Sequence, residues 1–195
     1  MSSLLTPEVL LLAYQRGYFP MADPETGEVA FYSPEVRAII PLERTRVSRS
    51  LRQTIRKGIY EIRINTAFEA VIQGCAERPY SWISPELISV YTDLHYEGFA
   101  HSVEAWYQGR LVGGLYGVAL GGAFFGESMF TRMRDASKVA FVALVERLRQ
   151  RGFVLLDAQY SNPHTQRLGA VEIPRYEYLR RLWEALRLQR RFADD

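Results

Sequence analysis

AHSVEAWYQGRLVGGLYGVALGGAFFGESMF, residues 100–130, consists of three apolar runs separated by the turn signals QGR and LGG. Runs of β-branched, aromatic and small residues with glycine-containing breaks between them are typical of short strands joined by tight turns. The stretch therefore predicts a three-stranded antiparallel meander. The elements on either side of this meander then set the fold class.

Helices and further strands are predicted on both sides of the meander. Thr6 and Ser48 precede runs with helical spacing, and Gly17, Gly98 and Gly152 follow such runs, as capping residues do. The segments around 18–28 and 31–35 contain prolines and are expected to be loop, with a turn at 23–28. We expect helices over 8–17, 48–57, 67–77, 85–97, 135–151 and 175–187, and strands over 36–40, 60–65 and 153–159.

This order of elements is that of an α+β acyltransferase of the GNAT type, in which helices flank a mixed sheet. We expect a small N-terminal subdomain over residues 1–36 and a GNAT-like acyltransferase domain over residues 37–195. In CoA-dependent members, a glycine-rich loop after the third meander strand holds the pyrophosphate through backbone N–H groups. The corresponding segment here, FTRMRDASK at 130–138, has no glycine, which disfavours a CoA site.

Composition indicates an ordinary globular chain. Of its 195 residues, 48% are hydrophobic and 24% charged, which is enough to form a substantial core. The single cysteine, Cys75, excludes an internal disulfide framework, and no Cys/His spacing suggests a metal. The N-terminal apolar run is too short and too interrupted for a membrane span or signal peptide. We expect a cytoplasmic protein without metal.

Basic residues cluster between positions 44 and 63, although the net charge of the whole chain is only +2. Such a cluster is consistent with a polyanionic partner such as nucleic acid, although the solvated face of an amphipathic helix is the commoner role of such a charge run. Within the helix expected over 48–57, Leu51 and Ile55 occupy one face and the cations occupy the others. The cluster comprises Arg44, Arg46, Arg49, Arg52, Arg56, Lys57 and Arg63.

A family resemblance is carried by nine short blocks that occur in order from about residue 13 to residue 180. The blocks are AYQRGYFPM, YSPEVRAI, WIS, AHSVEAW, LVGGLYGVALGG, FGESMF, DASK, LLDAQ and HTQRLGA. Together they resemble the leucyl/phenylalanyl-tRNA-protein transferases. The resemblance implies an enzyme that moves leucine or phenylalanine from aminoacyl-tRNA to a protein beginning with arginine or lysine, and so marks that protein for degradation. It also implies a GNAT-like main domain, a small N-terminal one, and neither metal nor CoA.

The chemistry of such a reaction points to three polar residues. Aminolysis of an aminoacyl ester needs no cofactor, but it needs positioned reactants, a group that takes the amine's proton and stabilisation of an oxyanion. Asp157 and Gln159 lie two apart in a predicted strand, so their side chains share a face. Glu127 would lie beside them if the two strands pair. We take Asp157, Gln159 and Glu127 as candidate catalytic residues; the alternative is that they are ordinary polar strand ends.

Apolar residues around Glu127 suggest a pocket for a leucyl or phenylalanyl side chain, in which the side chain of Met129 adapts to either shape. We also expect a methionyl group to serve as donor. Glu127 and Asp157 would then pair with the cationic N-terminal residue of the acceptor. Trp82 could stack on the unpaired adenosine at the 3′ end of tRNA, and Met21 stands where the family often has tryptophan. The alternative is that these residues are core. The candidate substrate-binding residues are Met21, Trp82, Leu115, Phe124, Gly126, Ser128, Met129 and Leu156, and the candidate tRNA-binding residues are Arg49, Arg52, Arg56 and Lys57.

Three other functions remain to be separated from this one. A CoA-dependent N-acetyltransferase would share the fold, and a tRNA-binding module without chemistry would share the basic cluster. Ser128, Asp157 and His164 occur in the chain order of an α/β-hydrolase triad, but GESMF lacks the second glycine of the nucleophile elbow. The leading interpretation is the transferase.

Overall fold

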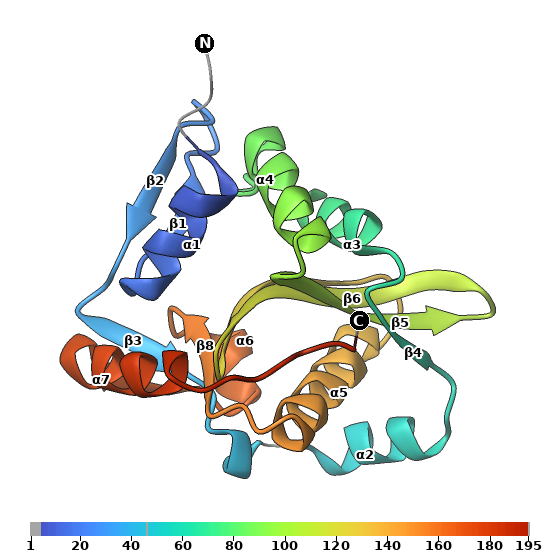
Figure 1. The fold of residues 1–195 in the computed structure, drawn as a ribbon. Helices are drawn as coiled ribbons and strands as arrows, with labels where there is room; N and C mark the ends of the chain where they lie inside the picture. Colours follow the sequence, from blue (N-terminus) through green and yellow to red (C-terminus); the bar gives the residue numbers. More distant parts are fainter. Residues whose placement is uncertain (1–4, 46, 195) are drawn as a thin grey trace.

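The computed structural model describes residues 5–45 and 47–194, so Arg46 of the basic cluster lies outside the described residues. The elements lie in the chain order shown in Figure 1. They are α1 (Pro7–Gln15), β1 (Phe19–Ala22), β2 (Val29–Tyr32), β3 (Val36–Ile39), the 3₁₀ turn η1 (Leu42–Arg44), α2 (Arg49–Arg56), β4 (Glu61–Ile64), α3 (Phe68–Ala76), α4 (Pro85–Tyr96), β5 (Ala100–Tyr107), β6 (Arg110–Leu120), β7 (Ala123–Thr131), α5 (Ala136–Gln150), β8 (Leu155–Gln159), α6 (Pro163–Arg167), β9 (Val171–Pro174) and α7 (Arg175–Leu186).

Seven of the described strands form one mixed sheet in the order β4-β5-β6-β7-β8-β3-β9. The predicted meander is confirmed, because β5 pairs with β6 and β6 with β7 in antiparallel fashion. The pair β7–β8 is parallel, and β3 joins β8 and β9 antiparallel. The expected α+β class, with a mixed sheet flanked by helices, is confirmed.

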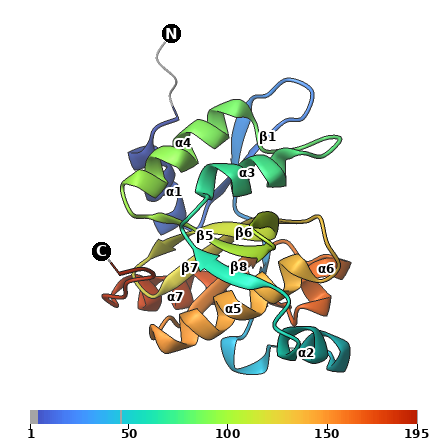
Figure 2. The ribbon, with the colours of Figure 1, turned by 90° about the vertical axis from the view of Figure 1, so that its right-hand side faces the viewer.

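Helices cover both faces of the sheet (Figures 1 and 2). Their apolar residues form two hydrophobic cores with the strands. On one face α1, α3, α4 and α7 pack their apolar residues against strand residues such as Tyr116 and Phe125. On the other face α5 packs against Leu115, Phe124 and Leu156. Helix α2 lies outside α5, where Leu51 contacts Val139 and Val142. No helix in the described part of the chain is long and apolar enough to cross a membrane.

The helix starts follow the predicted capping signals. Thr6 accepts the backbone N–H of Val9 at the start of α1, and Ser48 accepts that of Leu51 at 3.1 Å in α2. Each bond satisfies an N–H group that the first helical turn leaves without a partner. The predicted amphipathic helix near 48–57 is therefore confirmed.

Several elements differ from expectation. The segments predicted as loop around the turn at 23–28 form the hairpin β1–β2, with Asp23 and Glu28 bonded across the turn. Pro20 in β1 argues against a strand by propensity, yet a two-stranded edge tolerates it. The short helix α6 and the edge strand β9 are also absent from the sequence-based prediction. They are five and four residues long, and β9 exists because β3 lies beside it.

A β-bulge in β7 and the separation of β7 from β8 create the space for a site. Tyr116 pairs with Ser128 and Gly117 with Gly126, so Glu127 is an extra residue without a partner on β6. Bulges redirect side chains and are common beside active sites. Strands β7 and β8 pair only over Ala123–Phe125 and Leu155–Asp157, and beyond these residues a cavity opens.

Gly117→Ala tests how tightly the bulge is packed. A Cβ atom at Gly117 would overlap both the carbonyl oxygen of Phe125 and the ring of Phe124. We expect a loss of about 3 kcal/mol or more in the free energy of unfolding, because backbone must move. Gly114→Ala on the same strand is the control, since its nearest atom lies at 3.0 Å, and it should lose clearly less in urea unfolding. Equal losses would contradict this account of the bulge.

Candidate active site

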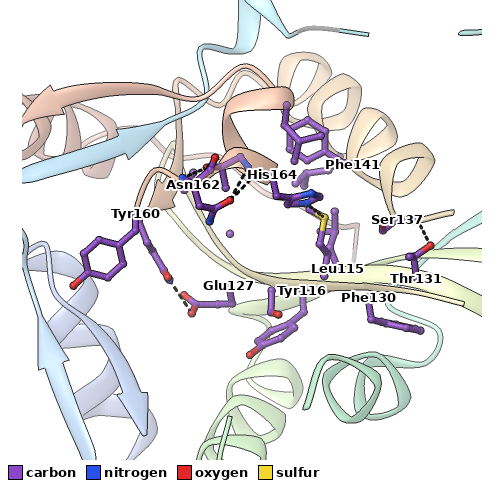
Figure 3. A pocket seen from close by; sticks show the side chains of 18 of the residues that line it. Leu115, Tyr116, Glu127, Phe130, Thr131, Ser137, Phe141, Tyr160, Asn162 and His164 are labelled. Carbon is purple, nitrogen blue, oxygen red and sulfur yellow. Dashed lines mark hydrogen bonds between the residues drawn. The ribbon is translucent and has the colours of Figure 1, made fainter. Parts of the chain in front are cut away.

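The cavity between β7 and β8 has a volume of about 770 Å³ and is lined by residues from several distant segments. In Figure 3 Tyr116 and Phe130 lie on one side of the strands, and Leu115, Phe141 and His164 lie on the other. Most of the residues singled out in the sequence meet here. Those that line the cavity are Met21, Trp82, Leu115, Gly126, Glu127, Ser128, Met129, Leu156, Asp157 and Gln159.

Phe124 is a correction to the sequence analysis. Its ring is fully buried, is absent from the cavity lining and packs against Phe192 at 5.1 Å between centroids. It belongs to the core on the α5 face of the sheet. The pattern of the strand could not show this, because Phe124 and the lining residue Leu156 share one face. Their surroundings differ because Phe192, from a distant segment of the chain, covers Phe124.

One side of the cavity is apolar. Leu115, Met129 and Leu156 face helix α5, from which Phe141 and Leu144 complete the wall. His164 places Nε2 3.0 Å from the Met129 sulfur, and burial lowers the pKa of this imidazole. The neutral ring thus closes the apolar side without adding a charge. The volume and lining suit a side chain of the size of leucine or phenylalanine.

The other side centres on Glu127, which is 7% exposed. Tyr14 donates a hydrogen bond to Oε1, and the side-chain amide of Gln159 donates to Oε2 at 3.0 Å. The hydroxyl groups of Tyr14 and Tyr91 are hydrogen-bonded to each other at 2.5 Å. The expected neighbourhood of Glu127 and Gln159 is therefore present, with two tyrosines from α1 and α4 added to it.

Burial raises the pKa of Glu127 to about 7 from its ordinary value of 4.5. The hydrogen bonds from Tyr14 and Gln159 oppose this rise, and the nearby negative charge of Asp157 adds to it. A carboxyl group with a pKa near neutrality can gain and lose a proton under working conditions, which is what a general base requires.

Asp157 is held by Arg37 in a buried ion pair. Nε and Nη2 of Arg37 donate to Oδ1 and Oδ2 of Asp157 at 2.9 and 2.6 Å, and both residues are 1% exposed. Desolvation opposes the charge on Arg37, but the Asp157 carboxylate outweighs it and raises the pKa of the guanidinium. Tyr178 also donates to Oδ2, at 3.1 Å. Asp157 is thus a fixed anion whose oxygens are already engaged, and it is not free to pair with a substrate cation, contrary to expectation.

Gln159 connects the two carboxylates. Its backbone N–H donates to Asp157 Oδ1 at 2.9 Å, and its φ of 61° lies in the left-handed region that a glutamine rarely adopts. Asp157 and Gln159 are therefore linked through the backbone of Gln159 and not through its side-chain amide. With its Nε2 on Glu127, the amide leaves its oxygen as an acceptor beside the cavity.

Four residues of this arrangement are not among the candidates from the sequence: Tyr14, Arg37, Tyr91 and Tyr178. Tyr14 and Arg37 lie within the blocks AYQRGYFPM and YSPEVRAI that carry the resemblance, and this is the signal that could have found them. Tyr116 also lines the cavity, and its hydroxyl is the only buried side-chain oxygen or nitrogen without a hydrogen-bond partner among residues 5–45 and 47–194.

The rim carries aromatic and basic groups. The carbonyl of Trp82 accepts the backbone N–H of Ala22 at 3.0 Å, which fixes Trp82 beside Met21 at the cavity edge. Arg78 lies near the Ser128 hydroxyl, at 3.4 Å, and donates to the Met129 carbonyl. The cations of α2, by contrast, do not line the cavity; all four are exposed, and none makes a salt bridge within the described ranges. They are Arg49, Arg52, Arg56 and Lys57.

A hydrolase triad is not assembled. Asp157 is committed to Arg37, while His164 contacts Met129 and Ser128 contacts Arg78. Cys75 is fully buried, and burial raises the pKa of its thiol to about 12, so it is a small core residue and not a nucleophile.

Comparison with known proteins assigns the family. The family described as leucyl/phenylalanyl-tRNA protein transferase matches residues 39–183, and its N-terminal domain matches residues 3–35. A leucyl/phenylalanyl-tRNA–protein transferase from Rubrobacter xylanophilus is 60% identical over 97% of this chain and 99% of its own length. Proteins of the same name from Gloeobacter violaceus and Herpetosiphon aurantiacus are 55% and 54% identical, over 96% and 98% of this chain and 97% and 100% of their own lengths.

The chain therefore belongs to the leucyl/phenylalanyl-tRNA protein transferase family, which confirms the resemblance and the expectation of a transferase. Among solved structures, that of L-PGS from Bacillus licheniformis is 13% identical with a TM-score of 0.44, over 80% of this chain and 51% of that one. This likeness is too low to bear on the activity.

Glu127→Gln tests the raised pKa through stability. Between about pH 4.5 and 7 the unfolded carboxyl is ionised while the folded one keeps its proton, so the free energy of unfolding falls as pH rises and levels off above about 7. The wild type should lose on the order of 3 kcal/mol across this window relative to Glu127→Gln, whose side chain does not titrate. Chemical unfolding at several pH values measures the difference. A constant difference between the two proteins would contradict the raised pKa.

Proposed function

We propose that this chain transfers leucine or phenylalanine, and also methionine, from aminoacyl-tRNA to the N-terminal amine of proteins that begin with arginine or lysine. The observation that carries the proposal is the meeting of an apolar cavity with the buried, protonatable Glu127 at the point where β7 and β8 separate. The family to which the chain belongs supports it. The product would be a new peptide bond at the acceptor's N-terminus, serving as a degradation signal.

The donor side chain would enter the apolar side of the cavity. Leu115, Met129 and Leu156 offer only carbon and sulfur, and Met129 can adapt its shape to a branched or a planar side chain. The 3′-terminal adenosine would then lie at the rim between Trp82 and Met21, where an indole can stack on a base. The ester that joins the aminoacyl group to this adenosine would face Gly126, Ser128 and their neighbours.

Glu127 would act on the acceptor in two ways. Its negative charge favours a cationic N-terminal residue, and the surrounding protein lowers the dielectric and strengthens that attraction. Its pKa of about 7 lies close to that of an α-amine, near 8, so it can take the proton of the α-ammonium group. The free amine then attacks the ester carbonyl, the C–N bond forms and the C–O bond to the ribose breaks. The ribose oxygen takes up the proton that the attacking nitrogen loses.

Gln159 and Asp157 would hold this geometry. The Gln159 amide donates to Glu127, so its oxygen can accept an N–H of the attacking amine. Asp157 acts as a positioning residue, because it fixes the Gln159 backbone and is itself fixed by Arg37. Each of these steps uses groups of the chain and the two substrates, so the proposal includes no cofactor.

Helix α2 would hold the acceptor stem of tRNA. Its cations are exposed on the face away from Leu51 and Ile55, which anchor the helix on α5. Lysine and arginine on an exposed helix contact phosphates without reading sequence.

We further propose a division into a subdomain over residues 1–36 and an acyltransferase domain over residues 37–195, because β3 enters the main sheet at this point of the chain. We also propose a cytoplasmic location, because charged tRNA is found there.

Transfer of labelled leucine from leucyl-tRNA to a peptide beginning with arginine tests the central proposal. The enzyme should use leucyl- and phenylalanyl-tRNA and discriminate against isoleucyl-tRNA by about tenfold or more, because branching at Cβ misplaces a methyl group worth roughly 1 to 3 kcal/mol. Equal use of isoleucyl- and leucyl-tRNA would contradict the proposed pocket, and absence of any transfer would contradict the proposed function.

The pH dependence of single-turnover transfer tests the roles of the two carboxylates. The wild-type rate should rise with pH through about 7, because Glu127 must be ionised to act as a base. Glu127→Gln should lack this rise and react roughly 10² to 10⁴ times more slowly. Asp157→Asn removes a negative charge that raises the Glu127 pKa, and it leaves the Arg37 guanidinium without its counterion. The rise of the transfer rate should therefore move to lower pH. A folded Asp157→Asn enzyme with an unchanged profile would exclude this coupling.

Alanine at Arg49, Arg52, Arg56 and Lys57 tests the role of α2. We expect weaker tRNA binding and a flatter dependence of log K on log salt, by about 0.7 to 0.9 for each phosphate that the variant no longer binds. Filter binding at several salt concentrations measures the slope. The side chains are exposed, so thermal stability serves as the control and should not change. The assignment would be wrong if the slope stayed the same.

A further inference from the structure

A second group of cations surrounds the end of β7 and the first turn of α5. Arg132, Arg134 and Lys138 have side chains that are 47%, 89% and 46% exposed. Arg78, also exposed, reaches the same strand end, where it donates to the carbonyl of Met129. We call the segment 132–138 the rim turn. It is distinct from the basic face of α2 and plays no part in the reaction steps given above.

The rim turn connects the cavity to α2. On the side of the cavity, the lining includes Arg132 and Ser137 of the rim turn and the preceding residue, Thr131. At the other end Asp135 accepts a hydrogen bond from Thr54 of α2 at 3.3 Å, and the carbonyl of Arg134 accepts one from Tyr60 at 2.6 Å. Figures 1 and 2 both show α2 beside α5. The rim turn therefore occupies the surface between the basic helix and the mouth of the cavity.

The cations of the rim turn are only partly neutralised. Glu77 pairs with Arg132 at 2.9 Å, and Asp135 lies 3.3 Å from Lys138 and 3.9 Å from Arg134. The exposed pair of Arg132 and Glu77 is worth about 0 to 1 kcal/mol and yields readily to a phosphate, while the one carboxylate of Asp135, 13% exposed, is shared between two cations. With Arg78, four cations face two acids within this group. The rim turn thus keeps a net positive charge next to the cavity, although the donor side chain proposed to occupy that cavity is uncharged.

We propose that the rim turn binds the phosphodiester backbone of the unpaired 3′ end of tRNA, between the acceptor stem on α2 and the aminoacyl group in the cavity. The inference rests on the proposed function. A single strand that leaves a stem held by α2 and ends in the cavity must cross this surface, and charge complementarity favours its phosphates. Arg134 and Lys138 are the contacts we assign to this backbone, because Arg78 and Arg132 line the cavity itself, whereas Arg134 and Lys138 lie outside its lining and share the single carboxylate of Asp135.

Two donors separate the rim turn from α2: full leucyl-tRNA, and a short oligonucleotide that carries only the unpaired 3′-terminal nucleotides and a leucyl ester. Arg134→Ala/Lys138→Ala should raise KM about tenfold for both donors at physiological salt and flatten the salt dependence by about 0.7 for each phosphate released. The α2 alanine variant should raise KM for tRNA alone. Arg134→Lys/Lys138→Arg should retain affinity, since either cation can hold a phosphate.

The matched control is Arg16→Ala/Arg187→Ala, which removes two exposed cations at the ends of α1 and α7. It should leave KM for both donors unchanged. The proposal is overturned if the rim-turn variant is folded and affects neither donor, or affects only full tRNA, which would assign these residues to the stem. If the wild type transfers leucine from neither donor, the proposed function fails instead.

Discussion

The buried ion pair between Arg37 and Asp157 holds the centre of the molecule together. It joins β3 to β8 in the interior, and the remaining Arg37 nitrogen donates to the carbonyl of Gly17 at the end of α1, 2.8 Å away. The guanidinium also lies over the rings of Phe19 and Tyr178, at 4.6 and 4.2 Å from their centroids. One side chain thereby fixes segments that are far apart in the chain.

Such a pair is costly to bury and still more costly to break. Removing one partner from a buried pair typically destabilises by about 3 to 5 kcal/mol, because the other charge remains without compensation. Here the cost has a functional counterpart. The anion of Asp157 holds Gln159 in a left-handed conformation and helps to raise the pKa of Glu127. The same charge that joins the strands thus adjusts the group proposed to take the proton.

In the proposed reaction, the two substrates would approach from opposite sides of one gap in the sheet. Because β7 and β8 separate after three paired residues, the apolar wall on the α5 face and the polar groups on the α1 and α4 face meet within a single cavity. The bulge turns Glu127 toward the polar groups, while Met129 two residues later faces the apolar wall. Transfer between two substrates needs such an arrangement, since the acyl group and the amine must approach from different directions.

The local sequence pattern is enough to predict most helices and strands of this protein. The short elements and the partners of the site residues depend on burial and on long-range contacts. Apolar periodicity, turn glycines and capping residues predict the meander, the long helices and the basic face of α2, because these depend on neighbouring residues alone. Short elements such as β1, β2 and β9 form because partners from elsewhere pair with them, so local propensity does not reveal them.

The sequence blocks identify the family, yet they give no reason for Tyr14 or Arg37 within them. Phe124 is core through the packing of Phe192, and Asp157 is a fixed anion through Arg37, which lies 120 residues earlier. Residue types at each strand end and helix face can be read from the chain alone. Their charge states, partners and directions cannot, because these arise from burial and from contacts that exist only once distant segments have come together.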